Sequence, residues 1–216
     1  VLRDGEPIRM TASRFVVSCG AVNSAALLLR SANDTHPNGL ANSSGLVGRH
    51  YMAHQATNLE AFHPFQKNTS VFQKTVAIND YYLRGPDTPF PLGQIQSQGR
   101  AYAAMAASVV PWMPVWIFEA WMARAVDWLV MTEDLPHPDN RVTLAPNGQI
   151  RLEYTPNNVT AHRRLVKEMK RVLRRLGFWV VASYSHDSRN TTHQCGTLCF
   201  GTDPTWSVLD PYCRAQ

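Results

Sequence analysis

The chain has 216 residues, of which 44% are hydrophobic and 17% are charged, and it carries a formal net charge of +5 at pH 7. This length and composition exclude a disordered chain and are typical of one large globular domain or two small ones. The four cysteines form no CxxC pair and the chain is too long for a disulfide scaffold, so cysteine usage leaves the redox compartment open.

The two ends of the sequence indicate a piece of a longer protein. The chain begins at Val1 without an initiator Met, no charged and then apolar leader follows, and it stops at Gln216 soon after a strand-like stretch. We therefore expect a fragment that is cut at both ends. The sequence predicts no particular cellular compartment.

The first part of the chain has the alternation of an α/β sheet. An apolar run from Phe15 to Val17 predicts a short strand, the small residues Ser18-Cys19-Gly20 follow it, and a helical pattern extends from Ser24 to Arg30. Gly20 suits either the close approach of a ligand or tight packing of the strand on the helix, and one glycine does not decide between them. Residues 33–48 are rich in Asn, Ser, Gly and Pro and predict a loop.

Several strands are predicted in the middle of the chain. Residues 71–78 and 92–98 have the composition of strands. Residues 141–154 form the clearest hairpin, because apolar residues alternate on both sides of Pro146-Asn147-Gly148 and Asn-Gly readily adopts the positive φ angles of a tight turn. These stretches predict an antiparallel sheet.

Between the predicted strands, residues 101–118 contain no charge, and their number reaches the lower limit for a membrane span. Pro111 and Pro114 interrupt the stretch, so we expect a buried or interfacial segment instead of a span. The tryptophans in or just after it can line a pocket, form an apolar surface that faces a membrane or partner, or pack in the core. They are Trp112, Trp116, Trp121 and Trp128.

An amphipathic helix is predicted from Thr160 to Leu176, with Thr160 as its N-terminal cap and Gly177 at its end. Seven Lys and Arg residues lie on it against one acid, Glu168, whereas the rest of the chain has 14 basic and 15 acidic residues. A basic helix can contact nucleic acid, an anionic membrane or an acidic partner. We interpret it as a solvated face and predict no nucleic-acid partner, because no aromatic residues are interleaved with the charges.

The segment THQCGT, residues 192–197, raises three interpretations of His193. Taken by itself, the segment favours a structural histidine with satisfied hydrogen bonds. A zinc site with Cys195, Cys199 and Cys213 does not match the ligand spacing of structural zinc sites, so no metal is predicted. Imidazole, with an ordinary pKa of about 6.5, also suits a catalytic base.

Two segments resemble the glucose–methanol–choline (GMC) flavin oxidoreductases. FVVSCGAVNSAALLLRSA followed by GLVGRHYMAH resembles the family's strand, glycine and helix element, although Ala25 and Ala32 replace a usual proline and glycine and His50 replaces a usual asparagine. THQCGTLCFGTDPTWSVLDPYCRA resembles the family's C-terminal segment, a His-x-x-Gly-Thr motif and then a Val-x-Asp strand. The matching positions are Gly20, Ser24, Leu27, Leu28, Ser31, His193, Gly196, Thr197, Val208 and Asp210.

The resemblance implies a fold of the α/β class, α+β overall. It implies that residues 1–50 are part of a GMC-type FAD-binding domain, that residues 51–190 form a substrate-binding domain with an antiparallel sheet and helices, and that residues 191–216 return to the FAD-binding domain. The family's dinucleotide-binding turn and its closing segment are expected upstream and downstream of these residues.

The resemblance also implies an activity, the FAD-dependent oxidation of a small-molecule alcohol, polyol or sugar by hydride transfer to the flavin. His193 is then the base, and we expect the fragment alone to be inactive. The residues expected to contact FAD are Cys19, Gly20, Gly48, His54 and Thr192. Oxygen, a quinone and a cytochrome all stay open as electron acceptor. The alternative is a non-catalytic docking module of flavoprotein-like fold that uses the Trp-rich segment and the basic helix.

Overall fold

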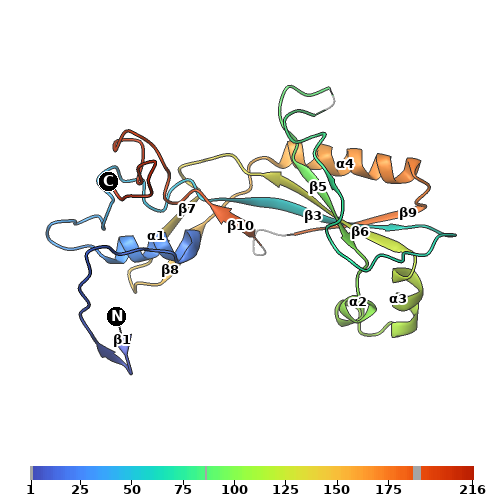
Figure 1. Ribbon diagram of the computed structural model, residues 1–216, viewed down its shortest axis with the longest axis horizontal. Helices are drawn as coiled ribbons and strands as arrows, with labels where there is room; N and C mark the ends of the chain where they lie inside the picture. Colours follow the sequence, from blue (N-terminus) through green and yellow to red (C-terminus); the bar gives the residue numbers. More distant parts are fainter. Residues whose placement is uncertain (1, 86, 187–190) are drawn as a thin grey trace.

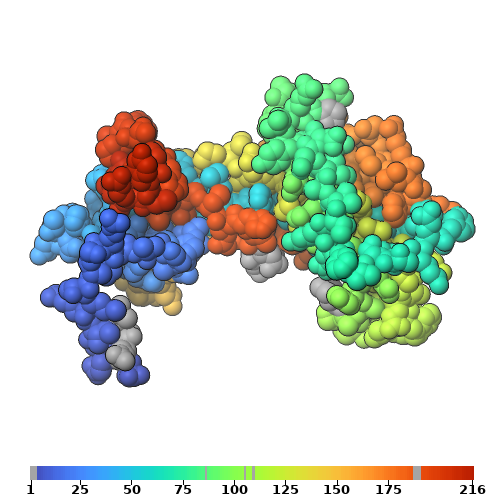
Figure 2. Space-filling view, in the orientation of Figure 1, coloured from blue at the N-terminus to red at the C-terminus, as the bar shows by residue number. Residues whose placement is uncertain are grey.

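The computed structural model describes residues 2–85, 87–186 and 191–216. The molecule is elongated and has two lobes joined by a narrower waist (Figures 1 and 2). Both chain ends lie in one lobe, which we call the terminal lobe (Figure 1). The other, which we call the sheet lobe, holds the main β-sheet and three of the described helices.

The terminal lobe is assembled from segments far apart in the sequence. Helix α1, Gly20–Arg30, packs against a hairpin of β7, Arg141–Leu144, and β8, Ile150–Glu153. The hairpin predicted at residues 141–154 is confirmed, with Gly148 at a φ of 78° in its turn. A second small hairpin pairs β1, Leu2–Arg3, with β2, Glu6–Pro7. The buried apolar residues of this lobe are Ala25, Ala26, Val47, Tyr51, Ala53, Val142 and Val208.

Six strands among the described residues form the antiparallel sheet of the sheet lobe. Their order is β10-β3-β6-β5-β4, and β9 also pairs with β3. The longest, β3, runs through the waist, so it belongs to both lobes (Figure 1). The strands are β3 Met52–Phe62, β4 Ala77–Ile78, β5 Gln94–Gly99, β6 Ala125–Glu133, β9 Val180–Ser185 and β10 Thr192–Cys195.

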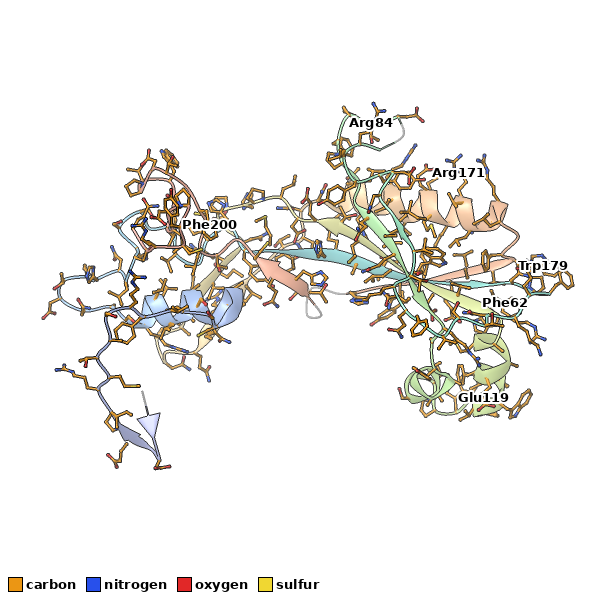
Figure 3. The ribbon with its side chains drawn as sticks, viewed as in Figure 1. Phe62, Arg84, Glu119, Arg171, Trp179 and Phe200 are labelled. Atoms are coloured by element: carbon orange, nitrogen blue, oxygen red, sulfur yellow. The ribbon has the colours of Figure 1, made fainter. Side chains whose placement is uncertain are left out.

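Helix α4, Val159–Arg175, covers one face of this sheet, and the basic helix predicted at residues 160–176 is therefore confirmed. Its apolar stripe of Leu165, Met169 and Leu173 is buried against strand residues such as Leu59 and Val130. Because side chains alternate along a strand, the neighbours of these strand residues point to the opposite face. In Figure 3 Arg171 of α4 and Glu119 of α3 lie on opposite sides of the sheet.

The uncharged stretch at residues 101–118 forms two short helices, α2 Ala103–Val109 and α3 Val115–Met122. No helix in the described part of the chain is long and apolar enough to cross a membrane. Trp112 and Trp116 are 79% and 67% exposed, whereas Trp121 stacks on Phe62 with ring centroids 4.4 Å apart. Trp128 lies half-buried beside the core under α4.

Three local predictions are wrong. The run from Phe15 to Val17 is not a strand, because no strand of the described chain pairs with it, and Phe15 is 71% exposed. The strand predicted at residues 71–78 shrinks to Ala77–Ile78. Thr160 does not cap α4, since the helix begins at Val159 and Asn158 occupies the cap position. The mixture of helices and antiparallel sheet is nevertheless the one predicted.

Candidate active site

A cavity of about 540 Å³ lies against the sheet face that α4 leaves uncovered. Polar side chains from β3, β5 and β6 line its floor, and His193 of β10 lies at its edge. Trp112, Trp116, Trp121 and Trp128 are not among the residues that line this cavity. The principal lining residues are His54, Lys74, Tyr82, Gln94, Gln96, Met131, Glu133, Asn158 and His193.

A β-bulge positions His193. Strand β10 pairs with the start of β3 through Thr192 opposite His54 and Cys195 opposite Met52, with a register shift between these pairs. Three steps along β10 therefore match two along β3, and such an extra residue turns the strand locally. His193 lies within the bulge, and its φ of 53° is in the left-handed region. This conformation costs a non-glycine residue roughly 1–2 kcal/mol.

The two histidine rings of this strand pair touch. The centroids of His54 and His193 are 4.9 Å apart and the ring planes are inclined by 87°, which is an edge-to-face contact. Burial lowers the pKa of His54 and the nearby His193 lowers it further, whereas a hydrogen bond to the Thr132 backbone and the Glu133 and Asp134 carboxylates act in the opposite direction without reversing the shift. His54 is therefore uncharged at neutral pH, while His193 is exposed to solvent at the cavity edge.

The His-x-x-Gly-Thr motif continues from His193 into the terminal lobe. Gly196 has a φ of 93°, and a Cβ there would lie 1.9 Å from the carbonyl oxygen of His50. The Thr197 carbonyl accepts a hydrogen bond from the Gly48 amide at 2.8 Å, and its buried hydroxyl donates to the Ala21 carbonyl at 2.7 Å. The motif therefore joins β10, the loop before β3 and the first turn of α1.

The predicted site residues fall into two groups in the structure. Thr192, His193 and His54 meet at the strand pair beside the cavity. The second group lies around the start of α1: Cys19 is exposed at the N-cap, and Gly20 has a φ of 75° with no described atom within 4 Å of the position of a Cβ. The positive φ, and not tight packing, therefore requires glycine at position 20.

Gly48 belongs to the second group, where its backbone packs closely against β7. Its φ is 86°, and a Cβ would lie 2.3 Å from the Val142 carbonyl oxygen. The Val142 amide donates a hydrogen bond to the Gly48 carbonyl at 2.8 Å. The loop before β3 is thereby fixed between the hairpin of β7 and β8 and the segment that follows β10.

Sequence reasoning missed the polar floor of the cavity. Gln94 and Gln96 lie on one face of β5, and Glu133 lies opposite His54 on β6. The alternation Gln94-Ile95-Gln96 was the available signal, because it predicts amide side chains on one face and an apolar one on the other.

His162, in contrast to His193, has the surroundings of a structural residue. His162 belongs to α4 and its ring is buried between the helix and the sheet, where its ring nitrogens lie 2.7 Å from the Thr57 hydroxyl and 3.1 Å from the Thr132 hydroxyl. Burial lowers its pKa to about 4, so it is a neutral structural histidine. Among the residues that the structure describes, no three His, Cys, Asp or Glu side chains come together as a metal site.

Comparison with known proteins gives related enzymes. A model of the GMC oxidoreductase family matches residues 136–216. The chain is 30% identical over 226 residues to paromamine 6'-oxidase of Streptomyces fradiae, covering 96% of the chain and 39% of that protein. It is 25% identical to the fructose dehydrogenase large subunit of Gluconobacter japonicus, covering 99% and 42%.

A third relative, 2-methyl-1,2-propanediol dehydrogenase of Mycolicibacterium austroafricanum, is 31% identical over 165 residues, which are 68% of the chain and 29% of that protein. The chain therefore spans well under half the length of the curated relatives that it matches.

Proposed function

Because the chain belongs to the GMC oxidoreductase family, we propose that it is part of an FAD-dependent enzyme that oxidises a CH–OH group of a small alcohol, polyol or sugar. The relatives support this class, since their names describe oxidases or dehydrogenases of paromamine, fructose and a propanediol. The observation that carries the proposal is the position of His193 at the edge of a polar cavity, within the His-x-x-Gly-Thr motif.

His193 is the proposed base. Oxidation of an alcohol requires removal of the proton on the hydroxyl oxygen, and a neutral imidazole accepts a proton through its unprotonated nitrogen. The exposed ring at the cavity edge can reach a hydroxyl oxygen there. A positioned base contributes roughly 10²–10⁴-fold to the rate.

The residues around the start of α1 fit an FAD site. FAD, when bound, supplies the hydride acceptor for this reaction. Cys19 and Gly20 lie at an open helix N-terminus, whose backbone amides favour anionic groups such as phosphate. Gly48 and Thr192 are joined to this region through Thr197 and β10. We therefore propose these four residues as FAD contacts.

The domain boundaries belong to the same proposal. Residues 1–50 and 191–216 would be parts of the FAD-binding domain, and residues 51–190 would be the substrate-binding domain. Residues 187–190, at the second boundary, lie outside the described residues. The hydrogen bonds that connect Thr197 with Gly48 and with the first turn of α1 support the grouping of the two terminal parts.

The cavity floor favours a substrate with several hydroxyl groups. The side chains of Gln94 and Gln96 each offer amide donors and a carbonyl acceptor, and the Glu133 carboxylate offers acceptors. Each hydroxyl group of a sugar or polyol can both donate and accept a hydrogen bond, so these side chains can bind it. The electron acceptor stays open among oxygen, a quinone and a cytochrome.

The test uses the full-length enzyme with flavin bound. Replacing His193 by Ala should slow anaerobic flavin reduction by substrate by roughly 10²–10⁴-fold, with the flavin retained. His36→Ala, at an exposed histidine of the terminal lobe, is the matched control and should react at the wild-type rate. Reduction of the His193→Ala flavin at near wild-type rate would remove His193 as the base.

A docking module is the second candidate function. The exposure of Trp112, between α2 and α3, and of Trp116 on α3 favours it, as does the basic face of α4. It predicts a full-length protein that is purified without flavin and does not oxidise alcohols with an artificial dye as acceptor. Flavin retention together with dye-linked oxidation of a sugar or polyol would exclude it.

A further inference from the structure

His54 lies beside His193 at the cavity, and not with Cys19 and Gly20 at the start of α1. His54 is the third residue of β3, half-buried, with its side chain on the cavity face of the sheet. Its Nδ1 is buried and has no hydrogen-bond partner among the described residues. Buried polar atoms of native proteins nearly always have a partner in the protein or in ordered water, so hydrogen bonds of this nitrogen to protein atoms do not account for the placement of the ring.

His193, the neighbour of His54, needs a support. It lies in a four-residue strand, is exposed to solvent, and has a backbone held in the left-handed region by the bulge. An exposed side chain on such a backbone samples several rotamers unless a neighbour restricts it. The edge-to-face contact with His54, at 4.9 Å between centroids, restricts the orientation of the His193 ring.

We infer that His54 is a positioning residue for His193, whose ring it holds toward the cavity through the edge-to-face contact. This inference rests on the proposed function, since it gives His54 a role only through the base. His54 itself sits on a long paired strand, opposite Glu133 of β6, so its backbone is fixed by the sheet. A residue on a rigid strand thus orients a residue on a strained one.

The charge state of His54 suits this role. Burial and the nearby His193 keep His54 uncharged, as its lowered pKa indicates. When His193 takes up the hydroxyl proton, the positive charge therefore meets a neutral ring and not a second cation. A neutral aromatic neighbour leaves the base free to be protonated, whereas a cationic one would oppose it.

Three substitutions at His54 separate the ring from the other properties of histidine. In the full-length enzyme, His54→Ala removes the ring, His54→Leu fills the volume without a ring, and His54→Phe keeps a ring without nitrogens. The limiting rate of anaerobic flavin reduction should fall about 10- to 100-fold in the Ala and Leu variants, because a small displacement of a catalytic group costs up to about 10² in rate. His54→Phe should recover the rate to within about threefold of the wild type, and substrate Kd should change little in all three.

A double-mutant cycle tests whether His54 acts through His193. In a His193→Ala background, adding His54→Ala should leave the reduction rate unchanged within about twofold, because the positioned group is already absent. A further fall equal to that of the single His54 variant, or a loss of flavin in His54→Phe, would overturn the inference and return His54 to the cofactor contacts. If His193→Ala alone has no effect, the proposed function fails first, and the cycle reports that separately. If His54→Ala does not fold, the comparison of Leu with Phe decides.

Discussion

The sheet lobe and the terminal lobe are held together by different kinds of contact. In the sheet lobe, regular antiparallel pairing and one amphipathic helix bury side chains such as Leu59, Leu165 and Val130. In the terminal lobe, four segments distant in the sequence meet through backbone contacts that require glycine, at Gly48 and Gly196. The candidate site lies at the junction, where β10 pairs with the start of β3.

This difference separates two tasks of an active site. The sheet supplies a rigid cavity floor of polar side chains, and the segment from β10 to Thr197 supplies a strained backbone that presents His193. Strained backbone persists only where the surroundings hold it in place. Here the hydrogen bonds of Thr197 and the close approach of Gly196 to His50 provide that hold.

The histidines reflect the same division. His162 of the sheet lobe is buried and bonded to two threonine hydroxyls, so it contributes to the core. His193 is exposed, in the short strand β10 beside the cavity. The two histidines therefore have surroundings that suit different roles, a structural one for His162 and a catalytic one for His193.

The largest expected effect tests the terminal lobe at Gly196. A Gly196→Ala substitution adds left-handed strain of roughly 1–2 kcal/mol and overpacking of roughly 1–3 kcal/mol, so the free energy of unfolding should fall by about 2–5 kcal/mol. Gly148→Ala is the matched control, because Gly148 also has a positive φ of 78° but no described atom lies within 4 Å of its Cβ position. Its free energy of unfolding should fall only by the cost of the left-handed strain, about 1–2 kcal/mol. Urea unfolding of both variants measures the difference.

If Gly196→Ala and Gly148→Ala lower the free energy of unfolding equally, the result would contradict the view that close backbone contacts hold the terminal lobe together. A Gly196→Ala variant of the full-length enzyme that is less stable, retains flavin and reduces it more slowly would extend this view to the site. The bulge at His193 would then depend on the contact of Gly196 with His50.

The second prediction concerns the sheet lobe and pH. Because the pKa of His162 falls from 6.5 in the unfolded chain to about 4 in the fold, the unfolded state binds more protons between these values. Stability should therefore fall as the pH is lowered from about 6.5 to about 4, by about 3 kcal/mol at most. Replacing His162 by Gln should flatten this fall, and urea unfolding at a series of pH values measures it.

Asp127 acts in the opposite direction over nearly the same range. Burial and then the opposing Glu60 carboxylate raise its pKa from 3.8 to about 6. The folded state binds more protons between those values, so this group makes the protein less stable as the pH rises through them. Asp127→Asn should therefore steepen the loss of stability on acidification. An unchanged pH dependence in both variants would show that neither group titrates as its surroundings imply.

In the sheet lobe the sequence predicted helix α4 and strand β5 but not the strands β3, β6 and β9. In the terminal lobe it predicted the hairpin of β7 and β8 but not the contacts that hold the lobe together. The apolar period of residues 160–176 and the Asn-Gly turn of the hairpin are local signals, and both elements are confirmed. The run from Phe15 to Val17 has the composition of a strand, but a strand needs a hydrogen-bonded neighbour that a local pattern does not reveal.

The site shows the same limit. The motif at His193 identified one edge of the cavity through its resemblance to a family, whereas the bulge depends on the register of β10 on β3 across more than a hundred residues. The contact between His54 and His193 follows from that register and from nothing nearby in the sequence. Gln94 and Gln96 were within reach, because their alternation with Ile95 is a local signal.

The smallest expected effect concerns the basic face of α4, which lies across the sheet from the cavity. Arg164 and Arg171 are not independent surface charges, because both pair with the buried Glu168, at 3.2 Å and 2.7 Å. Removing one partner of a buried acid leaves it partly unpaired and costs stability. A test of the solvated face therefore has to use other positions of the helix.

Arg163, Lys167 and Arg174 are exposed and form no ion pair among the described residues. Reversing all three to Glu should change the free energy of unfolding by no more than about 0.5 kcal/mol per position, as surface substitutions usually do. Turnover of a soluble substrate with a dye as acceptor should stay at the wild-type value, because the sheet separates this face from His193. Arg171→Glu is the contrasting variant and should destabilise more than any of the three. A loss of dye-linked turnover in the triple variant, with folding intact, would make this face part of the catalytic unit, whereas a loss only with the physiological acceptor would make it a docking surface.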